Sequence, residues 1–243
     1  MYDKQFKATN ENTKGNCYIC GVNLDSTEMK EHIIEFHKGD ENDQECLLLK
    51  VEGAYDNGYW LYIDVHMEKT LKSLDTFLRN VWLECCGHLS EFYECDHFPK
   101  YSTQGRFPIK NSRKMKTFAA GDRFFHIYDY GSTTEIAITV IGKTWRKPQR
   151  SIVRVIARNT PFVYKCDDCG KKAFYLCEVF IEPFESQFYC FECSEKHEDD
   201  EHYLHRVTNS PRMGICAYDG YYDTFEFNQK LEPIAKPRTF GSD

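Results

Sequence analysis

Apolar positions in the central part of the chain follow both strand and helix patterns. Runs rich in Leu, Val, Ile and Tyr cover 46–52 and 59–66, and the Asp56-Asn57-Gly58 segment between them is typical of a hairpin turn. Between Thr70 and Gly87 the spacing becomes helical and predicts a helix with one apolar face, formed by Leu71, Leu74, Leu78, Val81 and Trp82.

Further strand patterns follow this helix. Residues 89–95 and 151–157 each predict a strand, and 123–130 with 134–141 predict a second hairpin around Gly131. The order is strand, strand, helix and then strands. It predicts an α+β fold, with a mixed or antiparallel sheet, one main helix packed on it, and small zinc-binding modules at its flanks.

Changes in composition divide the chain into four parts. Residues 15–38 form a short finger-like unit, 45–160 the central domain, and 162–216 a region rich in Cys and His. The tail, 228–243, contains two prolines and is expected to be loosely ordered. We expect modular behaviour, in which metal removal unfolds both cysteine-bearing ends and leaves the centre folded.

Twelve cysteines in 243 residues are several times ordinary usage. The first fifteen residues are polar, so no secretory signal is expected, and no apolar run reaches the roughly 20 residues that span a bilayer. A cytoplasmic, reducing location is therefore expected, with no membrane partner. In that setting cysteines more often hold metal than form disulfides.

The first metal motif lies near the amino terminus. Cys17 and Cys20 form a Cys-x2-Cys pair, eleven residues separate Cys20 from His32, and four separate His32 from His37. Two thiolates and two imidazoles suit tetrahedral Zn²⁺. The segment resembles the Cys2His2 zinc finger, with a middle gap one residue shorter than usual.

The helix expected in this finger begins with a capping box of Asp25 and Glu28, and Met29, Ile33 and Phe36 are expected to pack over the metal. Acidic residues stand where a helix that enters a DNA groove carries Arg or Lys. A structural or protein-contact role is therefore favoured over DNA reading.

A second cluster occupies the carboxy-terminal part. Two Cys-x2-Cys pairs lie twenty residues apart and predict one zinc site, held by Cys166, Cys169, Cys190 and Cys193. A second site is predicted from the remaining ligand-type residues of the region, Cys177, His197, His202 and His205. By contrast, Cys85 and Cys86 are interpreted as packing groups, and Cys216 as a buried thiol.

The whole cluster resembles a B-box or RING-like cross-braced module. By position, Cys177, His202 and His205 match the third, seventh and eighth ligands of that module. The fourth ligand has no clear match, and His197 is the alternative to the nearby Glu178 and Glu182.

Charge is distributed unevenly. Residues 100–158 contain thirteen basic and three acidic residues, a net charge of +10, whereas 39–99 contain four and thirteen, a net charge of −9. Two interpretations are open: the blocks neutralise each other inside the fold, or the basic block binds nucleic acid. The candidate nucleic-acid contacts are Arg113, Lys114, Lys116, Arg123, Lys143, Arg146, Lys147 and Arg150.

Residues 45–158 resemble the plasmid pRiA-type ORF-three-like family, also labelled passenger proteins of insertion elements. Leu71 and Leu74 match the family's Leu-x2-Leu helix, and Trp82 matches its Trp. The family's His-Leu-x2-Phe strand is matched by His88, Leu89 and Phe92. The centre of its Tyr-x-Tyr-Asp-Phe-Gly-Asp signature is matched by Asp129, Tyr130 and Gly131, with Tyr128 nearby. Ser132 replaces the last Asp of the signature. The resemblance implies an α+β domain often found near mobile elements, and no established reaction.

These patterns together indicate a zinc-binding, non-catalytic interaction protein associated with mobile elements. It is expected to hold two to three zinc ions and to contact a protein partner. The alternative is a nucleic-acid-binding protein that uses 100–158. A zinc hydrolase or thiol enzyme is less favoured, because every predicted zinc ligand set is closed.

Overall fold

The computed structural model describes residues 13–95, 105–148, 151–179, 186–197, 202–216 and 218–220. These residues fall into two compact units. The first is drawn from 1–79 and 88–160, and the second from 80–87 and 161–243. The predicted tail, 228–243, lies outside the described residues.

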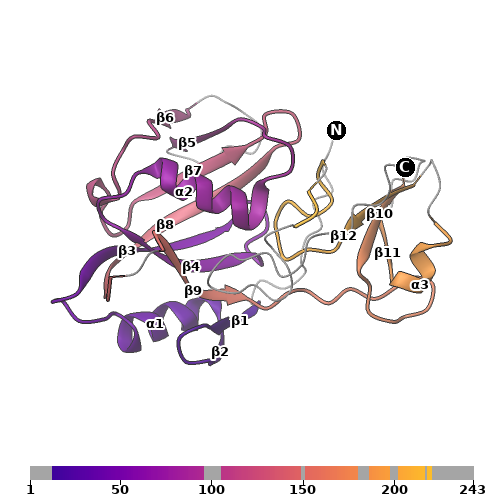
Figure 1. Cartoon of the computed structure of the whole chain (residues 1–243), viewed down its shortest axis with the longest axis horizontal. Helices are drawn as coiled ribbons and strands as arrows, with labels where there is room; N and C mark the ends of the chain where they lie inside the picture. Colours follow the sequence, from indigo (N-terminus) through magenta and orange to yellow (C-terminus); the bar gives the residue numbers. More distant parts are fainter. Residues whose placement is uncertain are drawn as a thin grey trace. The chain divides into compact units, whose positions relative to one another are not determined.

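The first unit is built on an antiparallel sheet, which has nine strands among the described residues, in the order β2-β1-β9-β4-β3-β8-β7-β5-β6 (Figure 1). In chain order the strands are β1 Lys14–Cys17, β2 Asn23–Asp25, β3 Gln44–Gly53, β4 Trp60–His66, β5 Ser90–Glu94, β6 Phe107–Ile109, β7 Arg123–Tyr128, β8 Thr134–Arg146 and β9 Val153–Asn159.

Helices are few and short in the described residues. The first unit contains α1 Ser26–Phe36, α2 Leu71–Leu78 and a 3₁₀ turn, η2 Met115–Thr117, and α2 continues into a π-helical turn, η1 Arg79–Leu83. The second unit contains α3 Phe191–Ser194 and a three-stranded sheet of β10 Tyr175–Val179, β11 Ser186–Tyr189 and β12 His202–Arg206.

The predicted α+β class is therefore wrong, because the described residues are mostly β-structure. Two local features explain the difference. The helical pattern after Thr70 forms regular α-helix only to Leu78. The strand predicted over 134–141 runs on to Arg146, and the finger contributes β1 and β2 to the same sheet.

Both predicted hairpins are confirmed, and in each turn an aspartate carboxylate accepts a hydrogen bond from a glycine N–H. β3 pairs with β4, yet neither Asn57 nor Gly58 has the positive φ of a type I′ turn. Instead the Asp56 carboxylate accepts a hydrogen bond from the Gly58 N–H at 3.0 Å. Between β7 and β8 the left-handed residue is Asp129, with φ 64°, and its carboxylate accepts a bond from the Gly131 N–H at 2.9 Å.

Helix α2 is fixed to the sheet by a buried polar contact as well as by its apolar face (Figure 1). The Asp75 carboxylate lies 2.8 Å from Nε2 of His126 on β7 and accepts a bond from the Ser90 hydroxyl on β5 at 2.7 Å. Burial lowers the pKa of His126, so this fully buried imidazole is neutral at physiological pH.

The open N–H groups at the beginning of α2 are satisfied by backbone carbonyls rather than by a side-chain cap. Thr70 makes no side-chain capping bond. The N–H groups of Leu71 and Lys72 donate instead to the carbonyls of Arg113 and Asn111, both at 2.9 Å. Backbone carbonyls thus accept from N–H donors that every helix start leaves open.

The finger shares its core with the sheet. β1 pairs with β2 on one side and with β9 on the other. The buried residues Met29 and Ile33 of α1 belong to one apolar cluster with the sheet residues Leu48, Trp60, Tyr62, Ile156 and Ala157. Residues 15–38 are therefore packed as part of the first unit.

Close approach at Gly15 makes this packing possible. A Cβ at this position would overlap the Arg158 carbonyl oxygen and the Trp60 ring. The Trp60 indole N–H donates to the Thr13 carbonyl at 3.1 Å, and the Tyr62 hydroxyl donates to the Ser26 carbonyl at the start of α1 at 2.8 Å. These bonds hold the chain just before the finger and the start of α1 on the sheet.

The second unit includes residues 80–87, which directly follow Arg79 of the first unit in the chain. Its Trp82 side chain is fully buried and donates through Nε1 to the Asn209 carbonyl at 3.0 Å. The Ser210 hydroxyl returns a bond to the Trp82 carbonyl at 2.7 Å. Residues 207–216 are thereby held against the segment that follows α2. None of the described helices is long and apolar enough to cross a membrane.

Two residues of α1, one buried and one exposed, allow the packing of this helix on the sheet to be tested. Ile33 is fully buried, whereas Phe36 is 64% exposed. We expect Ile33→Ala to lower the free energy of unfolding by about 2–5 kcal/mol, and Phe36→Ala to change it by about 0.5 kcal/mol or less. Urea unfolding of the two variants checks this. Equal losses would contradict a core shared between finger and sheet.

Candidate metal centres

The amino-terminal ligand set comes together as predicted. The four ligand atoms of Cys17, Cys20, His32 and His37 all lie within 4.8 Å of one another. Nε2 of His32 and of His37 lie 3.2 and 3.4 Å from the Cys20 sulfur, and 3.0 Å from each other. Ligands at zinc bond lengths in a tetrahedron are separated by about 3.3–3.8 Å, so this set suits one ion.

Local sequence explains the geometry of this centre. The capping box is confirmed: Asp25 accepts from the Glu28 N–H at 2.9 Å, and Glu28 accepts from the Asp25 N–H at 3.2 Å. The Cys17 N–H donates to the Val22 carbonyl, and Gly21, with φ 81°, donates back to Cys17. This tight turn presents both thiols on one side. Met29 and Ile33 pack against the sheet, and Phe36 is exposed.

The predicted four-cysteine centre also forms. The sulfurs of Cys166, Cys169, Cys190 and Cys193 lie within 4.8 Å of one another, with 3.7 Å between Cys169 and Cys190. That separation is far from the roughly 2.05 Å of a disulfide and close to the ~3.8 Å between two thiolates on one zinc.

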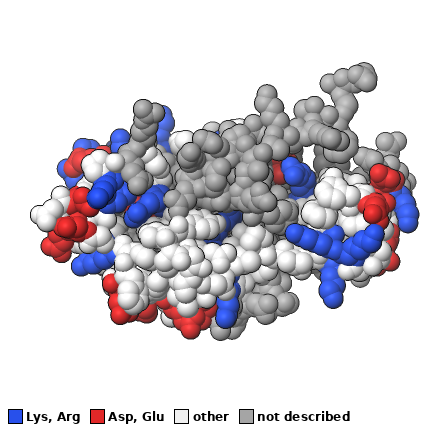
Figure 2. Space-filling view, turned by 60° about the horizontal axis from the view of Figure 1, so that its bottom comes forward, with Lys and Arg blue, Asp and Glu red and all other residues white. Residues whose placement is uncertain are grey.

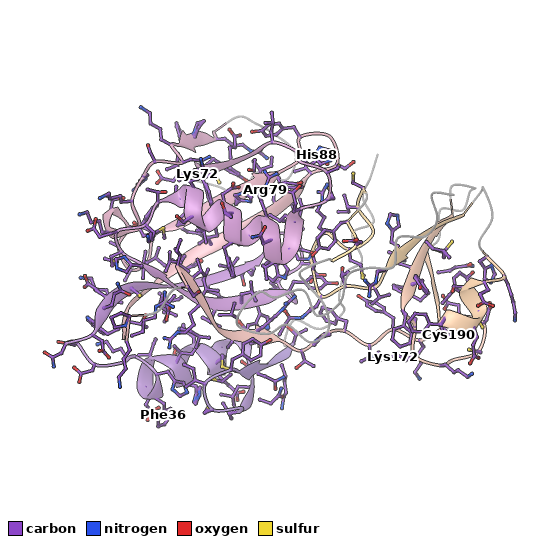
Figure 3. All side chains as sticks on the ribbon, in the orientation of Figure 1. Phe36, Lys72, Arg79, His88, Lys172 and Cys190 are labelled. Atoms are coloured by element: carbon purple, nitrogen blue, oxygen red, sulfur yellow. The ribbon has the colours of Figure 1, made fainter. Side chains whose placement is uncertain are left out.

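The two cysteine pairs of this centre are presented differently. The first repeats the turn of the finger: Gly170, with φ 71°, donates to the Cys166 carbonyl at 2.8 Å. The second pair stands at the start of α3, where Cys190 is the N-cap and Cys193 lies inside the helix (Figure 3). One turn of helix brings these two side chains to the same face.

The pKa values of the ligand groups shift in both directions, and burial raises the pKa of the Cys17 and Cys193 thiols. Burial, with His32 and Arg154 nearby, lowers the pKa of His37, so its imidazole is neutral. Burial raises the pKa of Cys166, but backbone N–H groups of Cys190, Cys169 and Asp168 outweigh it and bring that pKa to about 6. Neutral imidazole and thiolate are the forms that bind zinc.

The second predicted carboxy-terminal set is distributed differently. On the paired strands β10 and β12, Leu176 is opposite His205 and Cys177 is opposite Leu204. Because cross-strand neighbours share a face, Cys177 and His205 lie on opposite faces of the sheet. His197 Nε2 is 3.1 Å from an Asp168 carboxylate oxygen and its ring stacks on Tyr189. The His202 side chain lies outside the described part.

A third group of cysteines was missed by sequence reasoning. Cys85, Cys86 and Cys216 come together in the second unit, and their sulfurs lie within 4.8 Å of one another. Cys86 and Cys216 are exposed, so the interpretation of these residues as packing or buried thiols is wrong. His88 is the next potential metal-binding residue along the chain, two positions after Cys86.

Most described cations of the basic block have carboxylate partners. Glu68 pairs with both Lys114 and Lys116 at 2.8 Å, and these hydrogen bonds lower its pKa to about 2. Further pairs join Arg113 to Glu94, Lys143 to Glu45, Arg106 to Glu135, and both Arg146 and Arg154 to Asp64. Lys147 is exposed, Arg123 lies over the Phe125 ring, and Arg150 is outside the described residues.

The space-filling view agrees with this pairing. On the face shown in Figure 2, basic and acidic side chains of the described residues are interspersed and do not gather into a field of one sign. The acidic block 39–99 supplies Glu45, Asp64, Glu68 and Glu94 to these pairs. The two charge blocks thus neutralise each other within the fold at these positions.

The fold and these groups define a β-rich protein whose cysteines and histidines can hold metal ions. No protein-family model matches the chain, and no curated protein does either. Among solved structures, the chain is similar to a protein of unknown function, MM3350 from Methanosarcina mazei Go1, at 18% identity over 53% of this chain and 76% of that chain, with a TM-score of 0.39. A likeness at that score carries no argument, so the plasmid-family resemblance rests on its quoted residues alone.

The finger centre can be tested at Cys20, which is exposed, whereas Cys17 is buried in the apolar cluster. We expect Cys20→Ser to destabilise the first unit through metal loss alone. With free zinc at one hundred times Kd, the loss is about 2.7 kcal/mol. Urea unfolding followed by tryptophan fluorescence measures it, because Trp60 lies in the same cluster.

Two controls isolate the metal contribution. Cys95→Ser changes a half-buried cysteine of the same unit that belongs to none of the three ligand groups. This variant should have the same urea midpoint of unfolding as the unsubstituted protein. In excess chelator, Cys20→Ser and the unsubstituted protein should unfold together. If Cys20→Ser and the unsubstituted protein have the same urea midpoint of unfolding in zinc buffer, a stabilising metal at the finger centre is contradicted.

Proposed function

We propose that this chain is a zinc-stabilised, non-catalytic interaction protein. The observation that carries the proposal is the completeness of two ligand groups. Cys17, Cys20, His32 and His37 form one set of four, and the four cysteines between 166 and 193 form another. Structural zinc sites have four protein ligands, whereas catalytic sites have three and keep one position for water.

Ligand chemistry supports zinc over other metals. Two sulfurs and two imidazole nitrogens in a tetrahedral arrangement favour zinc, and four thiolates accept either zinc or iron. None of the twelve cysteines forms a disulfide in the part of the chain that the structure describes, which suits a reducing compartment such as the cytoplasm. Hard oxygen-seeking cations such as Mg²⁺ and Ca²⁺ are poorly served by these groups.

The competing functions have less support. A zinc hydrolase needs an open coordination position, which neither four-ligand group leaves. Nucleic-acid binding needs unpaired cations aligned with phosphates, and most described cations of 100–158 are engaged by carboxylates.

An interaction role is supported by the surface of the finger. Ile19, Ile34 and Phe36 are 43%, 42% and 64% exposed, and Figure 3 shows Phe36 at the outer side of α1. A hollow of about 370 Å³ beside them is lined by Phe36, Trp145 and Arg154 among others. Exposed apolar side chains beside a hollow suit a protein segment that carries apolar residues.

The proposal is tested on the full-length protein by elemental analysis and X-ray absorption at the zinc edge. We expect at least two zinc ions per chain and no stoichiometric iron. The absorption data should contain only sulfur at about 2.3 Å and nitrogen at about 2.0–2.1 Å. Fewer than one zinc per chain, or an oxygen ligand in each zinc shell, would contradict a closed structural role.

A further inference from the structure

The thiols of Cys85, Cys86 and Cys216 form a group that neither four-ligand centre uses. The Cys86 sulfur lies 3.7 Å from that of Cys85 and 3.6 Å from that of Cys216. These distances match the 3.7 Å within the four-cysteine centre and the ~3.8 Å expected for thiolates on one tetrahedral zinc.

The backbone around this group is held in an unusual shape. Cys216 has φ 55°, a left-handed conformation that non-glycine residues adopt at a cost. The segment leading to Cys85 contains the π-helical turn η1, and such turns are frequent at functional sites. Both features direct thiols that lie 130 residues apart in sequence toward one point.

Buried hydrogen bonds hold the two segments together independently of any metal. The Trp82 indole and the Ser210 hydroxyl cross-link residues 80–87 to 207–216. Arg212 is fully buried, and its guanidinium donates to the Cys85 sulfur at 3.4 Å. This bond adds another cross-link between the two segments, at one of the three thiols.

We propose that Cys85, Cys86 and Cys216 bind a third zinc ion, which cross-links the segment after α2 to the carboxy-terminal part of the second unit. A soft divalent cation with a preference for thiolate uses all three sulfurs at once. A disulfide uses two, requires a sulfur separation near 2.05 Å, and leaves the third thiol unpaired. The site is separate in its residues from both four-ligand centres.

The test is the zinc content of the full-length protein purified without chelator. The unsubstituted chain should carry three zinc ions. Cys86→Ser and Cys216→Ser should each carry two, and Cys95→Ser, which changes a cysteine outside all three groups, should keep three. Cys166→Ser should lose one ion from the four-cysteine centre, and the Cys86→Ser/Cys166→Ser double variant should lose two.

A rescue variant guards against loss by misfolding. Cys216→His replaces one zinc ligand by another, so it should recover the third ion that Cys216→Ser lacks. The proposal is overturned if the unsubstituted protein carries two ions and Cys216→Ser carries the same two. It is also overturned if intact mass shows the loss of two hydrogens that Cys216→Ser abolishes, since the pair is then a disulfide. A loss confined to Cys166→Ser assigns the metal to the four-cysteine centre alone.

Discussion

Burial of the finger helix against the sheet is the contact on which the first unit depends. Met29 and Ile33 lie in one cluster with Trp60 and Tyr62, and β1 hydrogen-bonds directly to β9. A metal that orders this finger therefore acts on the sheet as well. An independent finger of two dozen residues would obtain its stability from the metal alone, whereas this one also supplies side chains to a larger core.

Metal ligation has a different task in the second unit. Its sheet has three short strands, and its buried cluster consists of Cys166, Cys177, Tyr189, Cys190 and Cys193. Sulfur atoms thus occupy much of the space that aliphatic side chains fill in larger domains. In so small a core, the proposed cross-links through metal would replace apolar area as the source of stability. The bonds from Trp82 to Asn209 and Ser210 add a second anchor, built from a buried indole.

Sequence reasoning succeeded where the signal is local. The capping box at Asp25, the Cys-x2-Cys pairs that begin at Cys17 and Cys166, and both central hairpins depend on residues close together in the chain. It failed where the signal is long-range. Apolar periodicity after Thr70 overstated the α-helix, because the α-helix ends at Leu78 and a π-helical turn follows it. No motif spacing predicts that Cys86 and Cys216 lie close together. Cys177 and His205 lie on opposite faces of the sheet, which can be predicted only when the pairing register of β10 and β12 is known.

The central claim is that thiolates and imidazoles of this chain hold zinc in two four-ligand centres of different composition. Substitution of zinc by ¹¹³Cd, followed by one-dimensional cadmium NMR of the full-length protein, tests it most directly, because the chemical shift moves downfield with each added thiolate. The account predicts separate resonances ordered by thiolate number, with the four-cysteine centre furthest downfield and the Cys2His2 centre furthest upfield. A spectrum with a single resonance, or with shifts typical of oxygen ligands, would contradict it.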